Sequence, residues 1–238
     1  MATNRLIKFF TALTIIILGL AFIIKFAGPT LLRQYISYGI GDCKSVPILC
    51  REPNENVLTP EVDKEYINTL IEQEFPKLSI SAPKNFTLVQ ELIKRKYYKK
   101  RGIDKNAIIY LFRQEPNDFI KLYPSVQKQG ISDNYEFIRR LMYANLNKVN
   151  NITDAFFVIM KSVFTPDIGS QNISRVIKFK LGEKRGFVSY SMAKPNNFFD
   201  CNVLDPQGNF FKVYIKDTGG RLDLNNVFAI ISTLKAVD

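Results

Sequence analysis

The sequence predicts an α+β fold: a single N-terminal transmembrane helix followed by one globular domain with a mainly antiparallel sheet packed by helices. Two observations lead to this fold class. An uncharged apolar run, residues 9–24, stands behind a basic leader. After it come a helix, strands, two helices, strands and a closing helix, an order typical of α+β proteins. Hydrophobic residues make up 46% of the chain and charged residues 23%, as in a folded protein.

The apolar run divides the chain into a leader (residues 1–8), an anchor (9–27), a juxtamembrane connector (28–58) and a domain (59–238). With Lys8 and Lys25 snorkelling, the helix would be about 33 Å long, enough to span a bilayer. Lys25 and Phe26 stand where a signal peptide would carry small residues, so an uncleaved signal anchor is favoured over a cleaved signal peptide. We expect the N-terminus in the cytoplasm and the domain outside, in the cell envelope. Basic residues nearly balance across the helix, so this orientation rests on the helix being N-terminal.

The connector carries Cys43 and Cys50, whose spacing lets the two sulfur atoms meet. A disulfide would staple this stalk in an oxidising compartment. Two free thiols or acylated cysteines are the alternatives. The third cysteine, Cys201, lies in an apolar stretch and is expected to be a buried thiol.

The first half of the domain shows one helix and three strands. Thr59 and Pro60 suit the start of a helix whose apolar stripe runs from Ile67 to Phe75. Residues 85–98 and 106–113 then read as the two strands of a hairpin, the second one central because it is continuously apolar. Residues 119–124 read as another short strand.

The second half shows three helices and four strands. The Asp133-x-x-Glu136 pattern starts one helix, and a nearly all-apolar helix follows from Thr153 to Phe164. Two hairpins come next, formed by residues 176–181 with 186–192 and by residues 198–205 with 209–216. In the last strand, Phe211, Val213 and Ile215 should face the core and the alternate residues a mostly wet surface. Asp223 caps the closing helix.

The missing residues exclude several chemistries. The chain has no histidine, so Ser-His-Asp and Cys-His sites and imidazole-bound zinc are impossible. No phosphate-binding loop, nucleophile elbow or calcium-loop motif is present. Chance pairings such as Ser162 with Lys161, or Ser189 and Ser191 with Lys194, offer only a weak serine–lysine alternative. Asp200, Asp205, Asp217 and Asp223 cluster late in the chain and could pair as acid and base. Asp205 and Asp217 sit in turn sequences and Asp223 is placed to cap a helix, so a structural role is favoured. We predict no catalytic residue, no metal and no cofactor.

The formal net charge of +11 includes one dense basic run. Its members, with two interleaved tyrosines, are Lys94, Arg95, Lys96, Tyr97, Tyr98, Lys99, Lys100 and Arg101. One reading is a contact for anions, best supplied by the headgroups of anionic lipids. The other is a solvated hairpin tip whose lysines protect a sheet edge. Nucleic acid is not expected, because no recognition motif accompanies the charge.

Two pairs of phenylalanines form a second candidate contact: Phe198 with Phe199, and Phe210 with Phe211. One member of each pair should face away from the core and make an apolar patch for a partner, unless helices cover that face. Together these features predict a membrane-anchored, non-enzymatic binding or scaffolding protein, with another envelope protein or anionic lipid as its partner. The alternatives are a histidine-free enzyme and a carrier of a small apolar ligand.

Overall fold

The computed structural model describes residues 27–90, 107–165, 175–193 and 196–237. The chain divides into two compact units. The first combines the chain up to Cys50 with Ala144–Phe164, and the second combines Arg51–Tyr143 with Thr165–Asp238.

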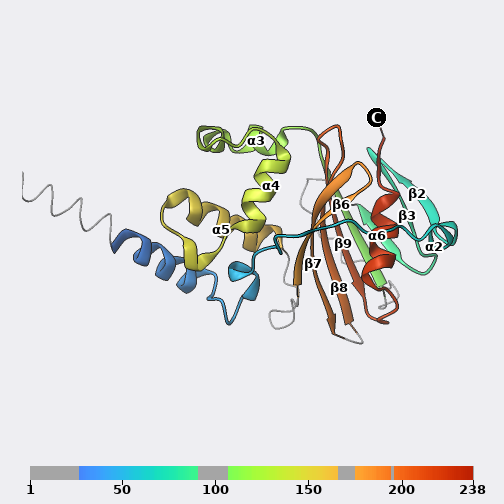
Figure 1. Ribbon diagram of the computed structural model, residues 1–238, viewed down its shortest axis with the longest axis horizontal. Coiled ribbons are helices and arrows are strands. Elements are labelled where there is room, and N and C mark those ends of the chain that lie inside the picture. The colour runs from blue at the N-terminus through green and yellow to red at the C-terminus, as the bar shows by residue number, and fades with distance from the viewer. Residues whose placement is uncertain (1–26, 91–106, 166–174, 194–195, 238) are drawn as a thin grey trace, which may run out of the picture. The chain divides into compact units, whose positions relative to one another are not determined.

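A seven-stranded sheet, with the strand order β1-β6-β7-β8-β9-β5-β4, forms the framework of the second unit (Figure 1). Its strands are β1 (Val57–Leu58), β4 (Thr87–Gln90), β5 (Ala107–Gln114), β6 (Arg175–Leu181), β7 (Lys184–Ala193), β8 (Asn196–Leu204) and β9 (Phe210–Asp217). The pairs from β6 through β9 to β5 are antiparallel, whereas β1 runs parallel to β6 and β4 parallel to β5. A smaller antiparallel sheet has the order β10-β3-β2, from β2 (Ile71–Phe75), β3 (Leu78–Ala82) and β10 (Lys235–Ala236).

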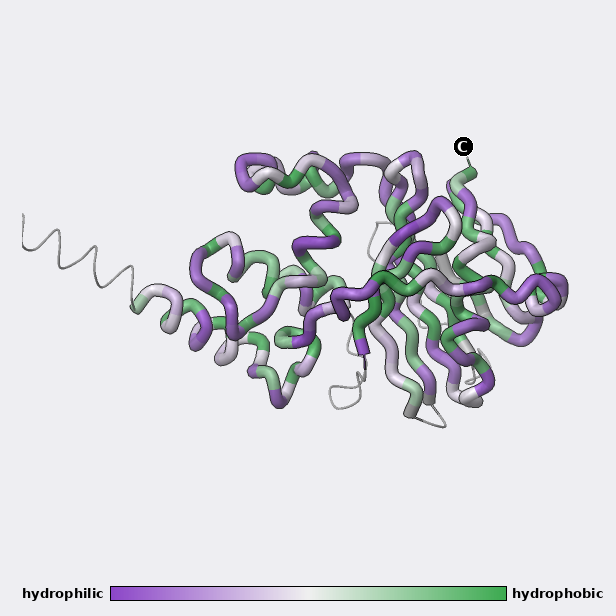
Figure 2. Tube along the Cα trace, viewed as in Figure 1, coloured by the Kyte–Doolittle hydropathy of each residue, from purple (hydrophilic) through white to green (hydrophobic). Residues whose placement is uncertain are grey.

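The main core lies on the face of the large sheet that packs against α6 (Leu224–Ser232) and β3. Figure 2 shows hydrophobic residues running along these strands and interrupted by hydrophilic ones. As predicted, Phe211, Val213 and Ile215 of β9 belong to this core, and Asp223 caps α6 through the Asn226 backbone N–H. Phe179 of β6 meets Phe228 of α6 edge-to-face, with ring centroids 5.3 Å apart.

The opposite face of the sheet is covered in part by aromatic side chains from α3 (Asp118–Leu122) and α4 (Asn134–Tyr143), which are joined by the 3₁₀ turn η2 (Pro124–Gln129). Phe119 contacts Phe210 edge-to-face, and Tyr135 and Tyr143 both pack on Phe187. This face is therefore less wet than the alternation in β9 suggests.

The first unit consists of a helix over residues 27–39, the 3₁₀ turns η1 (Pro47–Cys50) and η3 (Leu146–Lys148), and α5 (Ile152–Phe164). A small core of Ile36, Leu49, Leu146, Val149, Ala155 and Val158 joins them. Arg33 of the first helix donates hydrogen bonds to the Val149 carbonyl and to Asn150 Oδ1. Cys43 and Cys50 form a disulfide with a Cα–Cα distance of 5.5 Å.

The structure corrects the transmembrane part of the predicted fold class. Among the described residues, none of the helices combines the length and the apolar character needed to span a bilayer. The described part of the first helix, residues 27–39, carries Arg33 and buries Ile36 in the small core. Of the predicted anchor, only residue 27 lies within the described residues. The single-pass topology and the location in the envelope membrane, with the domain outside the cytoplasm, are corrected on the same finding. The part of the predicted fold class that agrees with the structure is a mixed domain in which helices pack around a sheet.

Three of the predicted elements are also wrong in type or pairing. The helix predicted from Pro60 to Phe75 is only α2 (Lys64–Asn68), because Ile71–Phe75 instead pairs with β3. Residues 118–122 form α3 rather than a strand. The predicted hairpin before β5 does not exist, because β4 and β5 are parallel and need a crossover rather than a tight turn.

Candidate functional site

The second unit carries a cleft of about 930 Å³ at one end of the large sheet. We call it the turn-end cleft. It lies where the β6–β7 and β8–β9 turns meet the end of α6 and β10. Its walls mix apolar side chains such as Leu181 and Leu234 with charged ones, of which Arg113, Lys184 and Asp205 matter most. A cleft with an apolar lining and a few placed polar groups is the usual form of a binding site.

Local sequence builds the two turns. Leu181 and Lys184 pair across β6 and β7, so the turn is only Gly182–Glu183, and Gly182 takes the positive φ of 59° that such a tight turn needs. In the β8–β9 turn, Gly208 also has a positive φ and donates to the Asp205 carbonyl. Asp205 accepts hydrogen bonds from the backbone and side chain of Asn209, at 2.8 and 2.7 Å. Asp205 therefore fixes the turn, as the sequence predicts.

Arg113 is held in the turn-end cleft by uncharged oxygen atoms. Its Nε and Nη2 donate to Asn209 Oδ1 at 3.3 and 2.9 Å. Its Nη1 donates to the backbone carbonyls of Lys77 and Val237. These four hydrogen bonds fix the position of the guanidinium. Because their acceptors are uncharged, none of them neutralises its positive charge.

Lys184 supplies a second cation to the turn-end cleft. Its half-buried ammonium donates to the Ser232 carbonyl at 2.6 Å. Burial lowers the pKa of Lys184, and the nearby charge of Lys235 lowers it further, while Asp205 opposes both effects. In the part of the chain that the structure describes, neither Lys184 nor Arg113 has a carboxylate oxygen within 4 Å. Two positioned cations without carboxylate partners make a site that attracts an anion.

The turn-end cleft does not present an activated serine nucleophile. Ser232 is the hydroxyl residue that lines it, and Ser232 Oγ donates to the Ala229 carbonyl of its own helix at 2.7 Å. An activated serine would instead direct its hydroxyl toward a neighbouring base.

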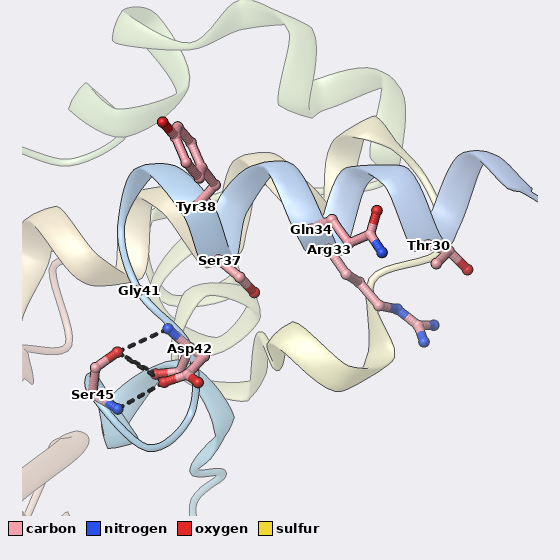
Figure 3. Close-up of a pocket in the computed structure, with 8 residues that line it drawn as sticks. All are labelled: Thr30, Arg33, Gln34, Ser37, Tyr38, Gly41, Asp42 and Ser45. Atoms are coloured by element: carbon pink, nitrogen blue, oxygen red, sulfur yellow. Dashed lines mark hydrogen bonds between the residues drawn. The ribbon is translucent and has the colours of Figure 1, made fainter.

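The first unit carries a shallower groove of about 650 Å³ along the helix over residues 27–39 (Figure 3). Its polar groups already serve the local fold. Asp42 accepts from the backbone N–H groups of Lys44 and Ser45 and from Ser45 Oγ, and these bonds from Ser45 hold the pKa of Asp42 below its ordinary value. In Figure 3 the Asp42–Ser45 turn lies across the helix from Tyr38. We therefore assign this groove no ligand.

The residues singled out from the sequence meet different outcomes. The basic run, Lys94 to Arg101, lies outside the described residues. The phenylalanine patch does not form, because Phe199, Phe210 and Phe211 are at most 1% exposed, and half-buried Phe198 packs near Tyr214. Helices cover Phe210, and the main core takes Phe199 and Phe211.

Of the weaker catalytic alternatives, the pairing of Ser189 and Ser191 with Lys194 involves a residue outside the described ranges, and the others are not assembled. Lys161 donates to the Ala144 carbonyl and Ser162 to the Ile159 carbonyl, so the two side chains have other partners. Asp217 accepts hydrogen bonds from the backbone of Gly219, Arg221 and Leu222, and Asp223 caps α6. Within the described ranges no group of acidic or cysteine side chains is arranged to hold a metal ion.

The sequence pattern did not identify Arg113 or Lys184 as site residues. Each stands at the end of a strand in a locally ordinary sequence, and their partners come from segments far away in the chain, at Val237 and Ser232. Only the folded sheet brings these segments together. Comparison with known proteins adds no relative: no protein family, no curated protein and no solved structure matches this chain.

Proposed function

We propose that the chain is a non-enzymatic binding protein that holds an anionic ligand in the turn-end cleft. The observation that carries the proposal is the pair of fixed cations, Arg113 and Lys184, whose hydrogen bonds end on neutral oxygen atoms. A carboxylate or phosphate group entering the cleft would supply the missing negative charge. The net charge of +11 would also draw such a ligand toward the protein.

The mixed lining narrows the ligand further. Leu181, Leu234 and Val62 line the same cleft as the two cations. A ligand that joins an anionic group to an apolar portion would use both parts of the lining. Glu183 and Asp205 also line the cleft, so a ligand carrying one or two negative charges fits better than a highly charged polyanion.

The carrier alternative has less support. It requires an empty apolar cavity between the sheet and the helices, but Phe179 and Phe228 meet in that layer. The enzyme alternative needs a nucleophile beside a base, which the Ser162–Lys161 pair does not supply. Lys194, the base of the other pairing, lies outside the described residues.

The test is a titration of ¹⁵N-labelled protein with benzoate, an anion with an apolar ring, followed by amide chemical shifts. We expect saturable shifts clustered at Gly182, Lys184 and Asn209. A parallel titration with benzamide, which keeps the ring but lacks the charge, should produce much smaller shifts. Absence of saturable shifts around the cleft, or equal shifts with benzamide, would contradict the proposal.

A further inference from the structure

A buried cluster of three reactive side chains lies on the α4 face of the large sheet, apart from the turn-end cleft. Lys212 of β9 is the direct cross-strand partner of Asn202 in β8, and Asp200 lies two residues before Asn202 on the same face. Lys212 Nζ lies 2.5 Å from Asp200 Oδ1 and donates to Asn202 Oδ1 at 3.0 Å. An amine is thus held between a carboxyl group and a carboxamide.

Water is largely excluded from this cluster. Asp200 and Asn202 are fully buried, and only 13% of the Lys212 side chain is exposed. On the other side of Asn202, the facing residue of β7 is Phe187, itself fully buried and packed against Tyr135 and Tyr143. An aromatic wall therefore stands beside the amide, and a charged lysine–aspartate pair in this setting loses hydration that its attraction must repay.

Burial changes the proton balance of the pair. It raises the pKa of Asp200, and the charge of Lys212 opposes that rise. A carboxyl group with a raised pKa holds a proton more readily, so Asp200 is suited to accept one from a neighbouring donor. A neutral lysine is a nucleophile, as in enzymes that desolvate a lysine to activate it.

The Asn202 amide lies close to the amine. Its Oδ1 accepts a hydrogen bond from Lys212 Nζ, so its carbonyl carbon, one bond of about 1.23 Å further on, is at most about 4.2 Å from the amine. Reacting atoms in productive arrangements lie about 3–3.5 Å apart, so the amine must approach the carbon by at most about 1 Å. Among the described residues, Asn202 Nδ2 donates a hydrogen bond only to the Met142 sulfur, at 3.8 Å, and a thioether sulfur is a weak acceptor. The group that would leave is therefore loosely held.

We propose that Lys212 and Asn202 join in an intramolecular isopeptide bond, with Asp200 as the proton carrier. Asp200 takes one proton from the Lys212 ammonium, and Nζ attacks the Asn202 amide carbon. Asp200 donates a proton to the amide oxygen as the tetrahedral intermediate forms. Asp200 then carries a proton from the attacking nitrogen to the departing nitrogen, and it takes back the proton of the oxygen as the carbonyl group re-forms. The Nζ–Cγ bond forms, the Cγ–Nδ2 bond breaks, and one ammonia molecule leaves, so no oxidant, cofactor or second reactant is required.

The same amine could condense with Asp200 instead, and the leaving group separates the two reactions. Bond formation with Asn202 releases ammonia, whereas bond formation with Asp200 releases water. We favour Asn202 because Asp200 is better placed as the proton carrier: its Oδ1 is the closer contact of the amine.

The experiment is peptide mapping by tandem mass spectrometry of the purified, reduced full-length chain. The digest combines trypsin with Asp-N, because no lysine or arginine separates Asn202 from Lys212, whereas Asp-N cuts between them, before Asp205. We expect the bond after Lys212 to stay uncut, and a branched peptide joining residues 200–204 to residues 205–216 to weigh one ammonia less than the sum of its parts. Finding Lys212 and Asn202 in separate, unmodified peptides would overturn the proposal. A branched peptide that has lost water through Asp200 would overturn the assignment to Asn202.

Variants separate the chemistry from other losses of ammonia. The Lys212→Arg and Asp200→Asn variants should each abolish the branched peptide. Lys216→Arg, on the same face of β9 but away from the cluster, should retain it. Persistence of the branched mass in Lys212→Arg would contradict the proposal. Because the wild-type map is decisive by itself, a variant that does not fold leaves the test intact.

Discussion

Arg113 and Asn209 come from different segments of the second unit, yet the guanidinium donates two hydrogen bonds to the single oxygen atom Asn209 Oδ1, at 3.3 and 2.9 Å. Asn209 is in turn tied to Asp205 by its own amide nitrogen at 2.7 Å. The chain Arg113–Asn209–Asp205 therefore couples a cation of the cleft to the β8–β9 turn. The Asn209 amide lies between the Arg113 guanidinium and the Asp205 carboxylate. The two charges therefore do not pair directly, and the guanidinium can bind an external anion.

Replacing Asn209 tests this coupling. Asn209→Ala removes two charge-assisted hydrogen bonds from Arg113 and one from Asp205, and it should lower the free energy of unfolding by about 1.5–3 kcal/mol. Urea denaturation followed by circular dichroism measures the change. The control is Asn226→Ala, which removes an asparagine side chain at the start of α6 and should cost about 1 kcal/mol. A smaller loss for Asn209→Ala than for the control would contradict the structural role assigned to Asn209.

The pH dependence of anion binding should report Lys184. Its pKa lies below the ordinary lysine value, chiefly because of burial, and a bound anion would favour the protonated form. Affinity should therefore fall as the pH rises through the lowered pKa of Lys184, before ordinary lysines deprotonate. In the protein without a ligand, the lowered pKa of Lys184 also makes the free energy of unfolding depend on pH. Between its folded pKa and the ordinary 10.5, the unfolded chain binds more protons, so stability rises with pH in that window.

Benzoate titrations from pH 7 to pH 10, for the wild type and for Lys184→Gln, measure the first of these effects. The wild-type affinity should decline more steeply with pH than that of the variant. Parallel declines in the two proteins would show that Lys184 does not titrate in contact with the ligand.

The disulfide should stabilise the first unit locally. Cys43 and Cys50 close a short loop beside the small core. Chain-entropy arguments give such a loop about 2–3 kcal/mol of stabilisation. Double replacement by serine should therefore speed hydrogen exchange in α5 and in the helix over residues 27–39. Unchanged exchange in both helices would show that the core holds the unit without the bond.

Asp223 offers a test of the predicted helix cap. Its side chain accepts from the Asn226 backbone N–H at 2.8 Å, and Asn226 Oδ1 accepts from the Asp223 backbone in return. Asp223→Ala should lower the free energy of unfolding by about 1 kcal/mol, whereas Asp223→Ser should restore most of the loss. Equal losses in the two variants, by thermal or urea denaturation, would argue against capping as the cause.

Local signals in the sequence located many of the elements correctly. The helices near Asp133 and Thr153, the four strands from β6 to β9 and the capped α6 all follow from apolar periodicity and turn residues. Periodicity failed where non-local pairing decided the structure. Ile67, Leu70, Ile71 and Phe75 fit a helical stripe, yet backbone bonds to β3 make Ile71–Phe75 a strand. The direction of β4 relative to β5 is likewise a property of the folded sheet.

The candidate site was less accessible to prediction than the fold. Arg113 depends on backbone carbonyls of Lys77 and Val237, and these carbonyls have no signature in the sequence. The phenylalanine pairs misled because both faces of β9 are covered, the second one by Phe119 of α3. A strand with one apolar and one mixed face does not reveal whether helices will cover the mixed face.

The most direct test of the binding proposal is calorimetric titration of benzoate into the wild type, Lys184→Gln and Lys180→Gln at neutral pH and low salt. Lys180 is an exposed lysine of β6 that does not line the cleft, so its variant removes the same charge elsewhere. We expect Lys184→Gln to weaken binding by about tenfold, because one charge-assisted contact is lost, and Lys180→Gln to change it by less than about twofold. Equal affinities in all three proteins, or no measurable binding to the wild type, would contradict the binding proposal.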